Sequence, residues 1–176
     1  GAARNAAERL EDAATVHKYT GVSPTVALHI PWDQTDDWDS LQQYAADLNI
    51  GIGAINPNVF QDQIYKLGSV CNPDSSVRRV AIDHMLECVD IMSITGSQDL
   101  SLWFADGTNF PGQGNFRQRK HWMEEALREV FGALNDNQRM LIEYKFFEPG
   151  FYHTDLTDWG TAYVMAKKLG DKAQVL

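Results

Sequence analysis

The feature that most constrains this chain is a regular alternation of helical and strand-like patterns. One amphipathic helical stretch comes first, four strand–helix pairs follow, and a last strand-like run closes the sequence. The runs predicted as strands are 25–30, 50–55, 100–104, 141–149 and 173–176. Strands that are joined through helices run parallel, so the pattern predicts an α/β fold with a parallel sheet covered by helices.

Capping residues and glycines mark the expected ends of the helices. The residues predicted to begin helices are Asn5, Thr35 or Asp36, Asn72 with Pro73, and Thr157. The glycines predicted to end them are Gly21, Gly96 and Gly170. In the last helix, the apolar residues expected on the inward face are Trp159, Ala162, Ala166 and Leu169.

Two parallel architectures compete for such a pattern, an open doubly wound sheet and a (β/α)₈ barrel. Gly51 and Gly53 invite comparison with a dinucleotide-binding loop, but position 56 is Asn and no helix starts directly after it. The open sheet therefore lacks its expected ligand loop. A barrel, in turn, needs more strands than these residues supply, so the alternation leaves both architectures open.

Polar and aromatic residues recur at or just beyond the carboxyl ends of consecutive predicted strands. They are His29, Asn56 with Asn58, Trp103 with Asp106, and Glu143 with Lys145. In a barrel, catalytic residues gather at this edge. The chemistry indicated is a carboxylate that can hold a hard divalent cation and a lysine placed near developing oxyanion charge.

The strand that carries Glu143 and Lys145 is the strongest of these signals. Alternate residues of a strand share a face, so the carboxylate and the ammonium should point the same way. Glu148-Pro149 should then end the strand, because proline cannot donate to a central ladder. An ordinary internal salt bridge is the alternative, just as His29 alone is more often a hydrogen-bonded core residue and Trp103 is more often a packing residue.

The charge balance and the cysteines narrow the class of protein. A formal net charge of −9 over 176 residues argues against a nucleic-acid or anionic-membrane partner, and no apolar run approaches the length of a membrane span. The basic cluster 117–120 is interpreted as a solvated helix face. Cys71 and Cys88 lack metal-ligand spacing, which favours free buried thiols in a reducing cytoplasm.

Several longer motifs resemble one known family. They are Leu141–Pro149, Leu102–Asn109, His29–Asp33, Asn58–Asp62 and Leu67–Ser69. In this order they are similar to the L-rhamnose isomerase family, in the group with broad aldose–ketose isomerase activity. More distantly, the chain resembles the xylose isomerase superfamily, which shares the barrel and the Glu-x-Lys strand.

The resemblance implies a (β/α)₈ TIM barrel of which this chain supplies about strands two to five and the start of strand six. Residues 1–176 would then be the central part of one barrel domain, incomplete at both ends. The remaining metal ligands would come from later strands, beyond Leu176. We therefore expect the segment alone to be inactive and to expose apolar edges.

The resemblance also implies a reaction and roles for particular residues. A metal-dependent isomerase would interconvert an aldose and its 2-ketose with two divalent cations, commonly manganese, and hydrogen would move between C1 and C2 by a hydride shift or through an enediol. Glu143 would be a metal ligand and Lys145 would hydrogen-bond sugar oxygens near the reacting carbons. The residues expected to contact or enclose the sugar are His29, Trp103, Trp32 and Phe60. The family is usually a cytoplasmic homotetramer.

Two other functions fit the same pattern less well. A barrel endonuclease would need a basic stripe for its substrate, and the acidic balance of this chain argues against it. A non-catalytic binding or assembly module that kept the barrel pattern is the main alternative to an enzyme.

Overall fold

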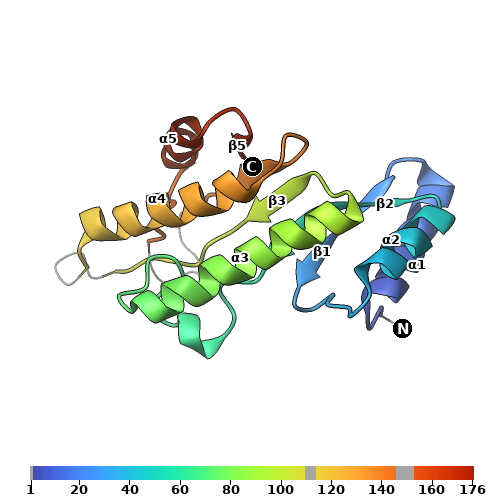
Figure 1. Ribbon diagram of the computed structural model, residues 1–176, viewed down its shortest axis with the longest axis horizontal. Helices are drawn as coiled ribbons and strands as arrows, with labels where there is room; N and C mark the ends of the chain where they lie inside the picture. The colour runs from blue at the N-terminus through green and yellow to red at the C-terminus, as the bar shows by residue number, and fades with distance from the viewer. Residues whose placement is uncertain (1, 110–113, 146–152) are drawn as a thin grey trace.

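The computed structural model describes residues 2–109, 114–145 and 153–176. The helices are α1 (Ala6–Thr20), α2 (Trp38–Asp47), the 3₁₀ helix η1 (Gln63–Tyr65), α3 (Ser75–Thr95), α4 (Phe116–Ala133) and α5 (Trp159–Leu169). The strands are β1 (Thr25–Ile30), β2 (Gly51–Pro57), β3 (Asp99–Leu102), β4 (Arg139–Ile142) and β5 (Ala173–Val175). The predicted alternation of strands and helices is therefore confirmed (Figure 1).

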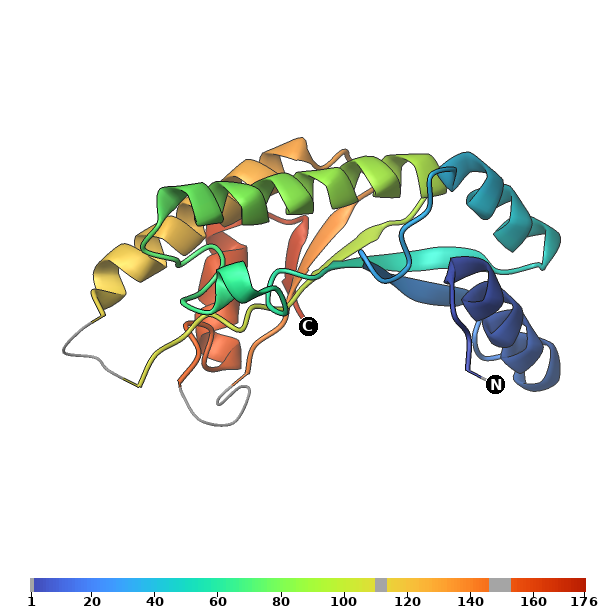
Figure 2. The same ribbon diagram turned by 90° about the horizontal axis from the view of Figure 1, so that it is seen from below.

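The strands form one five-stranded parallel sheet in the order β1-β2-β3-β4-β5. A doubly wound sheet reverses its strand order at a switch point, whereas a barrel adds each new strand beside the last one. The sequential order therefore excludes the doubly wound alternative and fits part of a barrel wall. Figure 2 shows α3 and α4 along one side of this sheet, and the described residues that directly follow β2, β3 and β4 extending from the same end of it.

Alternation along the strands sorts side chains between the helix layer and the opposite face. Leu100 and Leu102 of β3, and Met140 and Ile142 of β4, are almost fully buried in the hydrophobic core. The residues between them along each strand, such as Ser101, point to the opposite face of the sheet, which in a barrel is the interior. This alternation positions the candidate site described below.

Most predicted helix ends are confirmed, but three caps lie one or two residues later than predicted. Asn5 caps α1, and Gly21 and Gly96 follow α1 and α3 with φ of 70° and 72°. The N-cap of α2 is Asp37 and not Thr35 or Asp36. The N-cap of α3 is Asp74 and not Asn72, and the N-cap of α5 is Asp158 and not Thr157. In each case an aspartate carboxylate accepts a first-turn N–H at 2.8 Å. The pKa of Asp37 and of Asp74 is lowered most by a serine hydroxyl and next by this N–H, whereas the pKa of Asp158 is lowered most by the N–H itself.

The predicted inward face of α5 is only partly right. Ala162 and Ala166 are buried and Leu169 packs against the core, but Trp159 is 64% exposed. Trp159 is the first residue of the helix, and helical side chains lean toward the N-terminus. Its ring therefore extends past the core that the later turns cover.

Candidate active-site cleft

The carboxyl ends of β1 to β4 surround a cleft of about 410 Å³. Its lining residues are His29, Asn56, Pro57, Phe60, Ser101, Trp103, Glu143 and Lys145. Most of the residues predicted from sequence are thus brought together, but three are not. Trp32 and Asn58 line a neighbouring hollow, and Asp106 is buried outside the cleft, where it is bonded to Ser69 and Cys71. His29 and Glu143, which come from β1 and the end of β4, face the same space.

An aromatic wall encloses one side of the cleft. The His29 and Trp32 rings stack with centroids 5.3 Å apart, and Phe60 meets Trp103 edge-on at 4.4 Å. Trp32 and Phe60 are also in edge contact, at 6.5 Å. Flat apolar rings of this kind can pack against the C–H faces of a small polar ligand while polar groups elsewhere in the cleft bind its oxygens.

His29 is held in place through its backbone and its ring. The backbone N–H of His29 donates to Asp33 Oδ2 at 2.8 Å, and Asp33 N–H donates back to the His29 carbonyl at 2.8 Å. Asp33 is buried and its other oxygen pairs with Arg9 of α1 at 2.5 Å, which offsets the cost of burying its charge. Asn56 Nδ2 lies 3.0 Å from His29 Nε2.

Glu143 and Lys145 share one face, as predicted, but they lie beyond the strand and not within it. β4 ends at Ile142, and the Lys145 N–H donates to the Leu156 carbonyl instead of to a neighbouring strand. Lys145 Nζ lies 3.4 Å from Glu143 Oε1, with side chains that are 41% and 31% exposed. Phe146, Phe147, Glu148 and Pro149, the predicted end of the strand, lie outside the described residues.

Two buried polar atoms of cleft residues have no hydrogen-bond partner in the part of the chain that the structure describes. They are Asn56 Oδ1, an acceptor, and Trp103 Nε1, a donor. A buried polar atom without a partner costs about 1–3 kcal/mol. Sequence reasoning placed Asn56 at this rim but gave it no role.

The cleft offers part of a site for a hard cation. The Glu143 carboxylate lines the cleft together with the amide of Asn56, so the donor atoms are oxygens of the kind that hard divalent cations take. Such cations need about six ligands, and Glu143 is the one carboxylate among the described residues that line this cleft.

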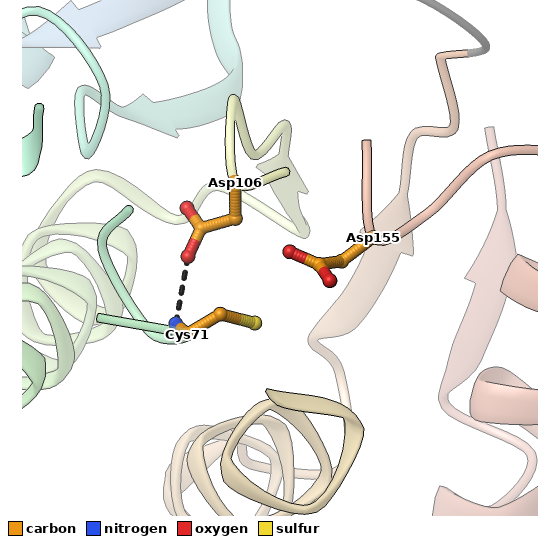
Figure 3. Close-up of side chains that lie close together, drawn as sticks. All are labelled: Cys71, Asp106 and Asp155. Carbon is orange, nitrogen blue, oxygen red and sulfur yellow. Dashed lines mark hydrogen bonds between the residues drawn. The ribbon is translucent and has the colours of Figure 1, made fainter. Parts of the chain in front are cut away.

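A second carboxylate group lies at the same end of the sheet and is built differently. Single ligand atoms of Cys71, Asp106 and Asp155 lie within 4.8 Å of one another (Figure 3). Burial raises the pKa of the Cys71 thiol well above its ordinary value, and its Sγ lies 3.4 Å from the Arg119 carbonyl oxygen.

The oxygens of both aspartates in this group are already used. Asp106 accepts from the Ser69 N–H at 2.9 Å, the Ser69 hydroxyl at 2.6 Å and the Cys71 N–H at 2.7 Å. Arg119 donates to Asp155 with Nε at 3.0 Å and Nη2 at 2.7 Å. A cation would have to displace the guanidinium and these donors, so we assign no metal here and call Ser69, Cys71, Asp106, Arg119 and Asp155 the rim network.

The interpretation of 117–120 as a solvated helix face is confirmed for Arg117 and Lys120, which are exposed, but it is wrong for Arg119, which is buried. Its side chain is only 8% exposed, because it lies on the side of α4 that faces the sheet. Burial by itself would lower the pKa of Arg119, but the hydrogen bonds and charge of Asp155 outweigh burial and raise it. The predicted burial of Cys71 and Cys88 as free thiols is confirmed.

Comparison with known proteins shows close similarity over nearly the whole chain. A probable sugar isomerase of Rhizobium meliloti is 43% identical over 178 residues, which cover 98% of this chain and 41% of that protein. A probable sugar isomerase of Mesorhizobium japonicum is 40% identical over the same share of both chains. The xylose isomerase of Thermus thermophilus is 26% identical over 107 residues, which cover 58% of this chain and 28% of that protein. The chain spans about two fifths of the length of the first two relatives. No family model matches the sequence.

Solved structures identify the fold. The structure of an L-ribulose 3-epimerase covers 99% of this chain and 56% of its own, with a TM-score of 0.72 and 15% identity. A D-psicose 3-epimerase structure covers 98% of this chain and 58% of its own, with a TM-score of 0.71 and 11% identity. The fold is part of a (β/α)₈ barrel. Within the described residues, no helix is both long and apolar enough to cross a membrane.

Proposed function

We propose that the complete protein is a metal-dependent sugar isomerase that interconverts an aldose and its 2-ketose, with L-rhamnose and L-rhamnulose as the first pair to test. The observation that carries the proposal is the cleft in which His29, Trp103, Glu143 and Lys145 meet at the carboxyl edge of the sheet. The similarity of the chain to probable sugar isomerases supports the same reaction class. Because the chain spans only part of those relatives, the remaining cation ligands are proposed to come from the rest of the protein.

Each cleft residue has a proposed task in this reaction. Glu143 is a ligand of a divalent cation, most simply Mn²⁺ with a second ion nearby, and the bound metal would polarise the sugar carbonyl. Lys145 donates hydrogen bonds to the sugar oxygens at the reacting carbons and stabilises the negative charge that develops there. His29 binds an oxygen at the far end of the sugar, where its ring is fixed by Asn56.

The aromatic wall and the two unpartnered atoms fit a polyhydroxylated ligand. Trp103 and Phe60 shield the reacting carbons from water and pack on C–H faces, and Trp32 supports them from behind through its contacts with His29 and Phe60. A sugar hydroxyl both donates and accepts, so it can satisfy Asn56 Oδ1 or Trp103 Nε1. We further propose that the protein is cytoplasmic, in line with its free buried cysteines, and that it assembles as a homotetramer.

The direct test is an assay of the complete protein with a panel of aldoses that includes L-rhamnose, with Mn²⁺ and again after chelation. We expect ketose formation that is lost with EDTA and restored by Mn²⁺. Product analysis by NMR separates aldose–ketose exchange from epimerisation at C3. Absence of metal-dependent ketose formation from every aldose would overturn the proposal in favour of a non-catalytic barrel module.

Two substitutions test the assigned roles separately. Glu143→Gln removes a charged ligand oxygen, so Mn²⁺ affinity measured by calorimetry should fall by a factor of 10 or more, as we estimate from the charge dependence of hard-cation sites. Lys145→Met should leave Mn²⁺ affinity unchanged and reduce kcat by roughly 10²- to 10³-fold, the usual cost of removing a donor to an oxyanion. Retention of full activity by both variants would show that the site is elsewhere.

A further inference from the structure

We infer that the ion pair Arg119–Asp155, at the centre of the rim network, is a positioning device for Lys145. This inference rests on the proposed function, in which Lys145 contacts the reacting part of the sugar. Lys145 lies three residues past the end of β4, so the sheet ladder does not fix its backbone. Another part of the structure must therefore hold it.

The segment 153–156 forms hydrogen bonds with both the N–H and the carbonyl of Lys145. The Lys145 N–H donates to the Leu156 carbonyl at 2.9 Å, and the Thr154 hydroxyl donates to the Lys145 carbonyl. The same hydroxyl lies 3.1 Å from the Leu156 carbonyl, and Thr154 is buried. The direction of the Lys145 side chain therefore depends on where this segment lies.

Asp155 anchors the segment through its backbone and its side chain. Its N–H donates to the Asp106 carbonyl at 2.8 Å, and its carboxylate receives the two-pronged bond from Arg119. A guanidinium fork fixes a carboxylate in both distance and orientation, which a single ammonium contact cannot do.

Arg119 is fixed in turn by the other two connections at this edge of the sheet. Its Nη1 donates to the Cys71 carbonyl at 3.2 Å, and Nη2 lies 3.4 Å from the Gly107 carbonyl. Cys71 follows β2, Gly107 follows β3 and Arg119 belongs to α4. The position of Lys145 is thus set by a chain of bonds that crosses three βα connections.

The network does not line the cleft itself. None of Ser69, Cys71, Asp106, Arg119 or Asp155 is among the cleft-lining residues, so we assign them a positioning role and no contact with the sugar. Their substitution should act through Lys145, and two measurements separate that effect from a general loss of stability. One is the protection of the Lys145 amide against hydrogen exchange, and the other is the dependence of the kcat loss on Lys145.

The experiment compares Asp155→Asn and Arg119→Lys in the complete protein with Leu10→Ala, which empties a fully buried site in α1 remote from the network. In the first two variants we expect exchange at the Lys145 amide to rise at least 10-fold while the Met140 amide, bonded to Lys172 within the sheet, keeps its protection. We expect kcat to fall roughly 10- to 100-fold with KM changed less than about 3-fold, because a misplacement of about 1 Å costs this much. Leu10→Ala should change neither the exchange rate of the Lys145 amide nor kcat.

A double substitution decides whether the effect passes through Lys145. In a Lys145→Met background, Asp155→Asn should cause almost no further loss of kcat, because the group that it positions is already gone. An equal loss in both backgrounds, or an unchanged Lys145 amide in Asp155→Asn and Arg119→Lys, would overturn the inference. If the unmodified protein converts no sugar, the proposed function fails, and the exchange measurement still decides whether the network holds Lys145.

Discussion

Gly68 offers a quantitative test of the rim network through a single methyl group. Its φ is 107°, a conformation that costs an L-residue about 1–3 kcal/mol. A Cβ built there would lie 2.9 Å from Asp106 Oδ2 and 3.4 Å from the Asn72 nitrogen. Asp106 cannot move away without giving up its donors from Ser69 and Cys71, and losing one bond to a buried carboxylate costs about 1.5–3 kcal/mol.

The matched control is Gly96→Ala, which has a positive φ of 72° and nothing within 4 Å of the added Cβ. We expect Gly96→Ala to cost about 1–2 kcal/mol from backbone strain alone, and Gly68→Ala to cost about 1.5–3 kcal/mol more than that. Urea unfolding of the complete protein, followed by tryptophan fluorescence, measures both. When Asp106 is also replaced by Ala, the extra destabilisation caused by Gly68→Ala, compared with Gly96→Ala, should largely disappear. Equal costs for the two alanine variants would refute the claim that Asp106 is rigidly held.

Two further predictions concern ionisable groups away from the cleft. Burial raises the pKa of both Cys71 and Cys88, so neither thiol should react with iodoacetamide in the native protein. Alkylation of the two thiols should follow global unfolding in urea. Fast labelling of either thiol without urea would contradict this burial. Hydrogen bonds from Lys120 and Lys168 lower the pKa of Glu124 in the folded protein below its ordinary value of 4.5. The stabilisation from this carboxylate is therefore present above pH 4.5 and is lost as the pH falls through the pKa of Glu124 in the folded protein. Glu124→Gln should therefore destabilise the protein by about 0.5–1 kcal/mol at pH 7, and a difference that persists undiminished at pH 3 would count against this pairing.

The parts of the fold that follow local periodicity could be predicted from the sequence. β1 was placed correctly because its apolar run ends at a proline, and His29 was placed at its carboxyl end. The alternation in β1 buries Leu28 and Ile30, which leaves His29 on the cleft side. Strand ends were less predictable, since a strand stops where ladder bonds stop, and the Lys145 N–H turns to Leu156 instead.

The sequence places Asp106 at a strand end and predicts a buried Cys71, but it does not link them to Arg119 and Asp155, although one signal of this link is present. Met123, Leu127 and Val130 mark the buried side of α4, and Arg119 stands one turn before Met123 on that same side. Its basic neighbours led to its interpretation as a solvated residue. Its partner Asp155 lies 36 positions further along the chain, and such a long-range pairing has no local pattern that a single sequence displays.

The bonding between connections limits how this barrel can be re-engineered. Variation of the loops at this face lets barrel scaffolds support many different chemistries. Here the turn after β2 supplies the donors for Asp106, and the segment before α5 depends on a guanidinium from α4. A graft that replaces one connection would leave buried charges of the others unmatched, so new specificities should be sought by exchanging these loops as a set.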